Sequence, residues 1–327
     1  MLFKCKNCGG NAVYDPDKES MFCPHCDSID SQEKLEGADY QSCVNCGAPI
    51  TPLEFTSATK CPNCGSYIIF DERVQGEYTP HLILPFKISK NKATEMIRNE
   101  FKKRVFTPSS FLSAASLKKM EGTYVPFFMY DYDVDAIYRG KGTKVRKWTT
   151  GNTEYTETSY YNVERDLDVT FEKIPVDASV NMEDKTMDLM EPYDYKALEA
   201  FQEHLMSGFL GERYSQSIDE LEPRAKEKTA RDTRQMIRES VTGYTTLSTE
   251  REEIRMAPKG RNYALLPVWI YHYNYQGKTY TYHVNGQTGK VIGVTPVSKP
   301  KVLGYSATVF GLCMVAGLLA YAMSFFV

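Results

Sequence analysis

Cys5-Lys6-Asn7-Cys8-Gly9 and Cys43-Val44-Asn45-Cys46-Gly47 are two copies of one motif, 38 residues apart. Each copy is followed by a second Cys-x-x-Cys pair, Cys23-Pro24-His25-Cys26 in the first and Cys61-Pro62-Asn63-Cys64 in the second. Shifting the first four cysteines by 38 residues places every one of them on a cysteine. An internal repeat of this kind indicates one structural module used twice.

The spacing predicts two metal sites, each built from four thiolates. A Cys-x-x-Cys turn directs two sulfur atoms to one point, and a second turn 14 residues later completes a tetrahedron around Zn²⁺. Four thiolates leave no open coordination position, so both zinc ions are expected to be structural. The predicted ligands are Cys5, Cys8, Cys23 and Cys26 in the first site, and Cys43, Cys46, Cys61 and Cys64 in the second.

The metal is expected to be required for folding, because a module of about 30 residues buries too little apolar surface to fold alone. Three other arrangements of these residues are compatible with the sequence. The pairs could be redox-active, although thioredoxin-like motifs occur singly in a βαβ context. The ligands could also be exchanged between the modules, or His25 could bind the metal, but the repeat favours two sequential sites and a solvent-facing His25.

Cysteine usage and charge argue against a secreted protein and against a nucleic-acid-binding protein. Eight of the nine cysteines lie in the four pairs, and the first residues contain no apolar stretch of the length that a secretory signal needs. The thiols are therefore expected in a reducing compartment. Residues 1–72 contain five lysines against eleven acidic residues, a net charge of −6. Phosphate binding requires the opposite sign, so protein binding or a structural role is favoured over nucleic-acid binding.

The sequence predicts zinc ribbons at 1–36 and 37–72, an α+β domain with an antiparallel sheet at 80–298, and a transmembrane helix at 303–327. Residues 72–80 are interpreted as a linker. The 23 tyrosines favour strands in the large domain. Expected strands cover 82–88, 124–138, 143–148 and 156–173, and expected helices cover 90–105, 194–206 and 222–241.

A β-hairpin is predicted at 269–284, with Gln276-Gly277 as its two-residue turn. This register places Tyr273 opposite Tyr280, Tyr271 opposite Tyr282, and Trp269 opposite Val284. One face then carries paired aromatic rings. His272 and His283 lie on the other face, where burial or hydrogen bonding is favoured over a metal site. The sequence contains no phosphate loop, nucleophile elbow or His-Glu-x-x-His motif, and an enzymatic activity is not expected.

The C-terminal segment predicts a membrane anchor. Residues 305–327 contain no charged side chain, and a helix of 23 residues spans about 35 Å, enough for a bilayer core of about 30 Å. Lys299 and Lys301 precede this segment and no basic residue follows it. The positive-inside rule therefore predicts a single-pass protein of the cell membrane with its N-terminal domains in the cytoplasm.

The two Cys-x-x-Cys modules, the Leu-Pro-Val-Trp-Ile-Tyr strand at 266–271, Val284-Asn-Gly-Gln-Thr-Gly-Lys-Val291 and the apolar tail occur together. This layout resembles the membrane-anchored double-zinc-ribbon proteins of Gram-positive bacteria, which are labelled as transcription-factor-IIB-type zinc ribbon or primosomal-helicase-like proteins. The resemblance implies SPFH (flotillin-like) or phage-shock-protein-A-like partners in membrane-stress systems. No helicase motif is present.

The resulting hypothesis is a membrane-tethered adaptor that recruits cytoplasmic protein partners to the bilayer. The alternative is a membrane-bound nucleic-acid-binding protein.

Overall fold

The computed structural model describes residues 1–37, 41–113, 117 and 119–323. Among them, a ten-stranded sheet forms the centre of the molecule, with β10, β7, β12, β8, β11, β5 and β6 side by side and β9, β13 and β14 attached to this row. Two further two-stranded sheets, β1–β4 and β2–β3, lie at the N-terminus. The strands are β1 Leu2–Cys5, β2 Val13–Asp15, β3 Ser20–Phe22, β4 Gln32–Leu35, β5 Thr56–Lys60, β6 Tyr67–Ile69, β7 Leu82–Ile83, β8 Glu121–Thr150, β9 Thr153–Asp177, β10 Glu199–Ala200, β11 Leu210–Glu212, β12 Thr246–Tyr275, β13 Lys278–Asn285 and β14 Val291–Gly293.

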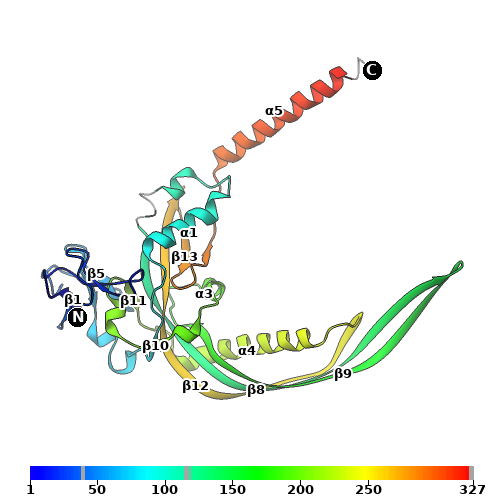
Figure 1. Ribbon diagram of the computed structural model, residues 1–327, viewed down its shortest axis with the longest axis horizontal. Coiled ribbons are helices and arrows are strands. Elements are labelled where there is room, and N and C mark those ends of the chain that lie inside the picture. Colours follow the sequence, from blue (N-terminus) through cyan, green and yellow to red (C-terminus); the bar gives the residue numbers. More distant parts are fainter. Residues whose placement is uncertain (38–40, 114–116, 118, 324–327) are drawn as a thin grey trace.

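Two of these strands, β8 and β12, are far longer than the sequence indicates, and β9 extends a few residues beyond each end of the strand predicted at 156–173. β8 and β12 have 30 residues each and β9 has 25, and their outer parts form an arm that extends away from the body (Figure 1). The predicted break between 138 and 143 is wrong, because Gly140 and Gly142 lie inside β8. A Cβ atom on Gly140 would meet the Ser248 carbonyl oxygen at 2.5 Å, and one on Gly142 would meet the Tyr244 ring at 2.4 Å. These glycines therefore permit close packing within the arm.

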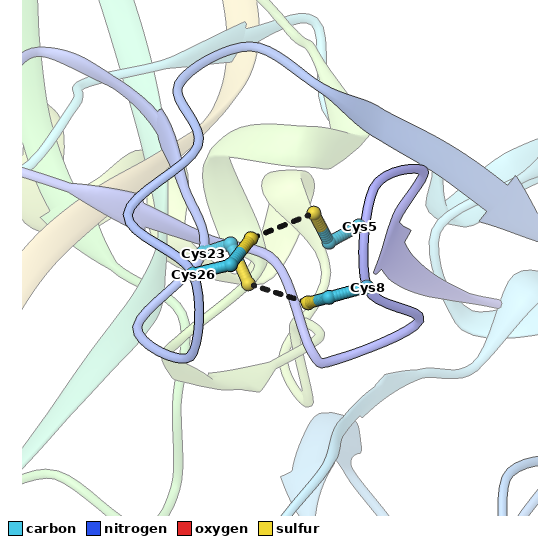
Figure 2. Close-up of side chains that lie close together, drawn as sticks. All are labelled: Cys5, Cys8, Cys23 and Cys26. Carbon is cyan, nitrogen blue, oxygen red and sulfur yellow. Dashed lines mark hydrogen bonds between the residues drawn. The ribbon is translucent and has the colours of Figure 1, made fainter.

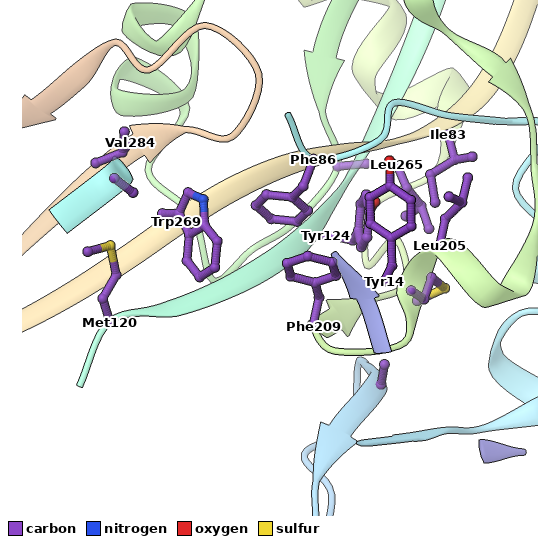
Figure 3. Packing of buried hydrophobic residues seen from close by; sticks show 14 of the residues in the cluster. Tyr14, Ile83, Phe86, Met120, Tyr124, Leu205, Phe209, Leu265, Trp269 and Val284 are labelled. Carbon is purple, nitrogen blue, oxygen red and sulfur yellow. The ribbon is translucent and has the colours of Figure 1, made fainter. Parts of the chain in front are cut away.

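The predicted hairpin is confirmed in its register. Tyr273 pairs with Tyr280, Tyr271 with Tyr282, and Trp269 with Val284. Its aromatic face is part of the main core, where Phe86 stacks on Phe209 with ring centroids 4.0 Å apart (Figure 3). The indole N–H of Trp269 donates to the Ile88 carbonyl at 2.8 Å, so burial of the ring leaves its donor satisfied.

The sheet is mostly antiparallel, as predicted, but it contains two parallel pairs, β11 with β8 and β12 with β7. The strand predicted from 82 to 88 is regular only at β7, and the N–H groups of Lys87 and Ile88 both donate to the Gly286 carbonyl instead of continuing it. The predicted linker at 72–80 is packed against the body instead of free, since Val74 is buried and Tyr78 contacts Tyr214 with ring centroids 5.3 Å apart.

The helices differ in how well the sequence predicts them. The α-helices are α1 Lys90–Lys102, α3 Asp184–Met190, α4 Ile218–Ser240 and α5 Lys299–Met323, and the 3₁₀ turns are η1 Asp71–Arg73, η2 Gly76–Tyr78, η3 Ser109–Leu112, η4 Tyr195–Ala197 and η5 Glu203–Met206. α1 buries Ala93, Ile97 and Phe101 as predicted, but it ends before Val105, whose side chain is exposed. α4 begins at a capping box between Ser217 and Glu220, four residues before the predicted start at 222.

The helix predicted at 194–206 is wrong. That segment contains η4, β10 and η5. Glu199 and Ala200 pair with Ile83 and Leu82, so backbone pairing with a distant strand overrides the apolar spacing of Leu198, Phe201 and Leu205.

One described helix, α5, is long and apolar enough to cross a membrane. Its Lys299–Tyr321 part has a mean hydropathy of 1.9, and none of it is buried. In Figure 1 it leaves the body without lying against another element. At its base, Phe106 contacts Tyr305, and the Lys301 ammonium donates to the Thr107 carbonyl at 2.7 Å.

Candidate metal centres

The eight predicted cysteines form two compact groups. Cys5, Cys8, Cys23 and Cys26 make the first group, and Cys43, Cys46, Cys61 and Cys64 make the second; within each group the sulfur atoms lie within 4.8 Å of one another. The ligand sets are therefore sequential, and the exchanged arrangement is excluded. Four thiols in this arrangement could hold one metal ion per group.

The sulfur–sulfur distances fit a tetrahedral metal. In the first group, Cys5 and Cys26 are 3.6 Å apart and Cys8 and Cys23 are 3.5 Å apart (Figure 2). In the second group the equivalent distances are 3.7 and 3.8 Å. A tetrahedron with Zn–S bonds of about 2.3 Å has edges of about 3.8 Å, whereas a disulfide bond is only about 2.05 Å long. The spacing fits metal coordination and not disulfide pairing.

The backbone around the two groups repeats as closely as the sequence. The backbone N–H groups of Cys5 and Cys43 each donate to the carbonyl five residues later at 2.8 Å, and those of Gly9 and Gly47 donate to the carbonyls of Cys5 and Cys43. Gly9 and Gly47 have φ angles of 69° and 68°, a region that favours glycine. This explains why a glycine follows the first Cys-x-x-Cys pair in both modules.

A second layer of polar groups, which sequence reasoning missed, supports the sulfurs. The Asn7 amide donates to the Ser28 hydroxyl at 2.8 Å, and the Asn45 amide donates to the Ser66 hydroxyl at the same distance. Ser28 and Ser66 are again 38 residues apart, so the repeat contained the signal. Outer-layer bonds of this kind orient metal ligands.

These serines also act on the thiol charge. The hydroxyl and backbone N–H of Ser28 lower the pKa of Cys26 to about 6. Burial raises the pKa of Cys64, but hydrogen bonds from the hydroxyl and backbone N–H of Ser66, with smaller contributions from Asn45 and Cys46, lower it to about 6. Cys26 in the first group and Cys64 in the second thus favour the thiolate form that metals bind.

The two groups are attached to the body differently. In the second group, Cys61 and Cys64 lie in the turn between β5 and β6, which belong to the central sheet, and β5 pairs with β11. The first lies on small separate sheets that contact the body around Ser207. The Ser207 hydroxyl donates to the Ala12 carbonyl at 2.7 Å, and the Tyr14 amide donates to the Ser207 carbonyl at 2.8 Å.

The histidines take no part in either group. His25 is exposed, in agreement with the sequence analysis. The His272 ring contacts the Thr281 hydroxyl at 3.1 Å. His283 is buried, and burial, together with nearby His272, lowers its pKa to about 4, although Glu183 acts in the opposite direction. The alternating acids of β8 face solvent or bond locally, as Asp133 does with the Thr170 hydroxyl at 2.6 Å.

A charged network between α3, α4 and β9 was also missed by the sequence analysis. Lys228 is buried and donates to Glu191 at 2.5 Å and to Asp188 at 3.1 Å. Arg224 donates to the buried Asp177 at 2.7 Å. Lys228 thus packs inward from a helix whose other charged side chains are mostly exposed.

Sequence comparison adds one relative. The chain is 36% identical over 321 residues to the uncharacterized protein YdjG of Bacillus subtilis (strain 168), and the match covers 94% of each chain. No family model and no solved structure matches the sequence.

Proposed function

Because the chain belongs to the same family as the uncharacterized protein YdjG of Bacillus subtilis, a name that states no activity, we propose its function from its architecture. We propose a membrane-tethered adaptor whose cytoplasmic body, stabilised by two structural zinc ions, recruits protein partners to the bilayer. The observation that carries this proposal is α5, which is wholly apolar over its central part and unburied. An exposed helix of this kind is stable only in lipid or against a partner.

Zinc is the metal proposed for both groups. Four cysteine sulfurs with edges of 3.5–3.8 Å match the ligand type and size of a tetrahedral Zn²⁺ site. With four thiolates bound, the ion would supply folding energy and no catalytic position. The eight cysteines would hold the N-terminal modules in shape, and the second module would also fix one edge of the central sheet.

The body is proposed to lie in the cytoplasm. Its eight thiols need a reducing compartment to stay available for metal. Lys299 and Lys301 precede the apolar segment, and the positive-inside rule places them on the cytoplasmic side. A reporter fused after residue 327 should therefore lie outside the cytoplasm and one fused before residue 1 inside. The reverse result would overturn both arguments.

The adaptor function requires that the body binds a protein partner. The acidic N-terminal modules favour a protein over a polyanion, and the resemblance described above supplies SPFH or phage-shock-protein-A-like proteins as the partner classes. We expect such a partner to be crosslinked to the full chain in membranes.

The experiment compares the full chain, a tail-deleted chain ending at residue 298, and a chain in which an unrelated membrane helix replaces residues 303–327. The partner should be in the membrane fraction with the first and third chains, and in the soluble fraction, still bound, with the second. If the partner's membrane fraction is unchanged when the whole protein is deleted, the adaptor function is wrong. Salt-sensitive DNA binding by the tail-deleted chain would support the nucleic-acid alternative instead.

A further inference from the structure

The outer end of the arm is a two-stranded hairpin. β12 begins at Thr246, which pairs with Thr143, and beyond this point only β8 and β9 remain paired, from Lys144–Ser159 to Thr150–Thr153. A hairpin of two strands is marginally stable in water by itself. The side chains on its faces therefore matter for its stability.

One face of this hairpin carries exposed aromatic and cationic side chains. We define the cation–aromatic face as Lys144, Arg146, Trp148 and Tyr155 on the hairpin, together with Tyr161 at its base. Trp148 stacks on Tyr155 with ring centroids 5.5 Å apart and planes 11° apart. The Arg146 guanidinium lies 5.6 Å from the centre of the Trp148 ring, and the Lys144 ammonium lies 5.3 Å from that of Tyr161. Trp148, Tyr155 and Tyr161 are each 40–45% exposed, which is unusual for rings of this size.

The face carries more cations than acids: besides Lys144 and Arg146 it holds one carboxylate, that of Glu157, which the register places opposite Arg146. From 136 to 150, β8 contains five cations and no acid. Three of them form ion pairs, Arg139 with Asp166, Lys141 with Glu250, and Lys147 with Glu154. In the part of the chain that the structure describes, Lys144 and Arg146 have no carboxylate within 4.0 Å, so the two cations on the aromatic rings are those left unpaired.

We propose that the cation–aromatic face rests on the anionic headgroups of the bilayer that α5 would cross. Tryptophan and tyrosine are enriched at the membrane–water interface, and lysine and arginine next to them are attracted to lipid phosphates. In Figure 1 the arm curves, and its tip turns toward the side of the molecule from which α5 leaves.

The proposal goes beyond the adaptor function but uses its membrane anchor. Two cations attract a membrane too weakly to hold a free protein, and each contributes about a fivefold gain in affinity. A protein already tethered by α5 presents the hairpin to the lipid at a high effective concentration, so a weak contact suffices. The face would therefore fix the orientation of the arm relative to the membrane, whereas attachment would still depend on 303–327.

The test follows the fluorescence of Trp148 in the full chain. Trp148 and Trp269 are the two tryptophans, so Trp269→Phe leaves Trp148 as the reporter. The protein is inserted into phosphatidylcholine nanodiscs, with or without phosphatidylglycerol, whose lipids carry bromine atoms near the headgroup. Co-elution with the nanodisc establishes the α5 anchor independently. We expect several-fold stronger quenching of Trp148 when phosphatidylglycerol is present, and loss of that difference in Lys144→Glu/Arg146→Glu.

A matched variant changes two cations elsewhere on the arm. Lys259 and Arg255 lie on β12, pair with Asp133 and Glu253, and are 51% and 76% exposed at their side chains. Lys259→Glu/Arg255→Glu should retain the quenching, and hydrogen exchange of 144–159 shows whether each variant keeps the hairpin. Equal quenching in both lipids in a nanodisc-inserted protein overturns the proposal. Shielding of Trp148 that instead follows protein concentration assigns the face to a second copy and also overturns it.

Discussion

His283 should make the protein less stable as the medium becomes acidic. It lies on β13, opposite Ile270 of β12 and Ile292 of β14, and the residue is only 9% exposed. Its Nδ1 atom has no hydrogen-bond partner. Burial and nearby His272 lower its pKa to about 4, despite an opposing effect of Glu183, so the folded protein keeps this ring neutral.

The sign follows from proton uptake. In the unfolded chain His283 has an ordinary pKa of 6.5 and binds a proton as the pH falls below that value, whereas the folded protein resists protonation down to about 4. Its contribution to stability is therefore complete above pH 6.5 and is lost as the pH falls toward 4. The full difference corresponds to about 3 kcal/mol, and about 2 kcal/mol of it falls between pH 7 and pH 5.

The assay compares urea unfolding of the detergent-solubilised chain with that of His283→Leu at pH 7 and pH 5. Both proteins lose stability in acid through their thiolate metal sites, and this common effect cancels in the double difference. We expect the drop in unfolding free energy to be about 2 kcal/mol smaller in the variant. Equal drops, or an NMR titration of His283 with a midpoint near 6.5, would refute the argument from burial.

Three further changes test other parts of the structure. Cys5→Ser/Cys8→Ser should reduce the bound zinc, measured by native mass spectrometry, from two ions to one. The second site should keep its ion because it is supported by β5 and β6 of the central sheet, and loss of both ions would show that the two sites depend on each other. Gly142→Val should destabilise the arm by about 1–3 kcal/mol, because its Cβ would lie 2.4 Å from the Tyr244 ring, and hydrogen exchange of 143–161 should rise while that of β13 stays unchanged. Lys228→Met should cost about 3–5 kcal/mol in thermal or urea unfolding, because Glu191 and Asp188 lose their buried partner, and an unchanged midpoint would show that water replaces it.

The sequence by itself determined the features set by short spacings. The two groups of cysteines follow from Cys-x-x-Cys turns, whose geometry depends on a few neighbouring residues such as Gly9 and Gly47. The hairpin register around Gln276-Gly277 follows from a two-residue turn and from strict alternation, because a slip of one residue would turn Trp269 and Tyr271 to the other face. The apolar C-terminal helix follows from composition and length.

The tertiary structure decided what depends on distant partners. Segment 194–206 has helical spacing, yet Glu199 and Ala200 pair with β7, which lies more than a hundred residues away in sequence. The sequence did not predict the length of β8, because Gly140 and Gly142 are typical of a turn, and only the folded structure shows that Ser248 and Tyr244 occupy the space beside them. The second cysteine module joins the central sheet through β11, a contact that no local pattern encodes. Local propensities differ by only a fraction of a kcal/mol per residue, so packing and long-range pairing decide such segments.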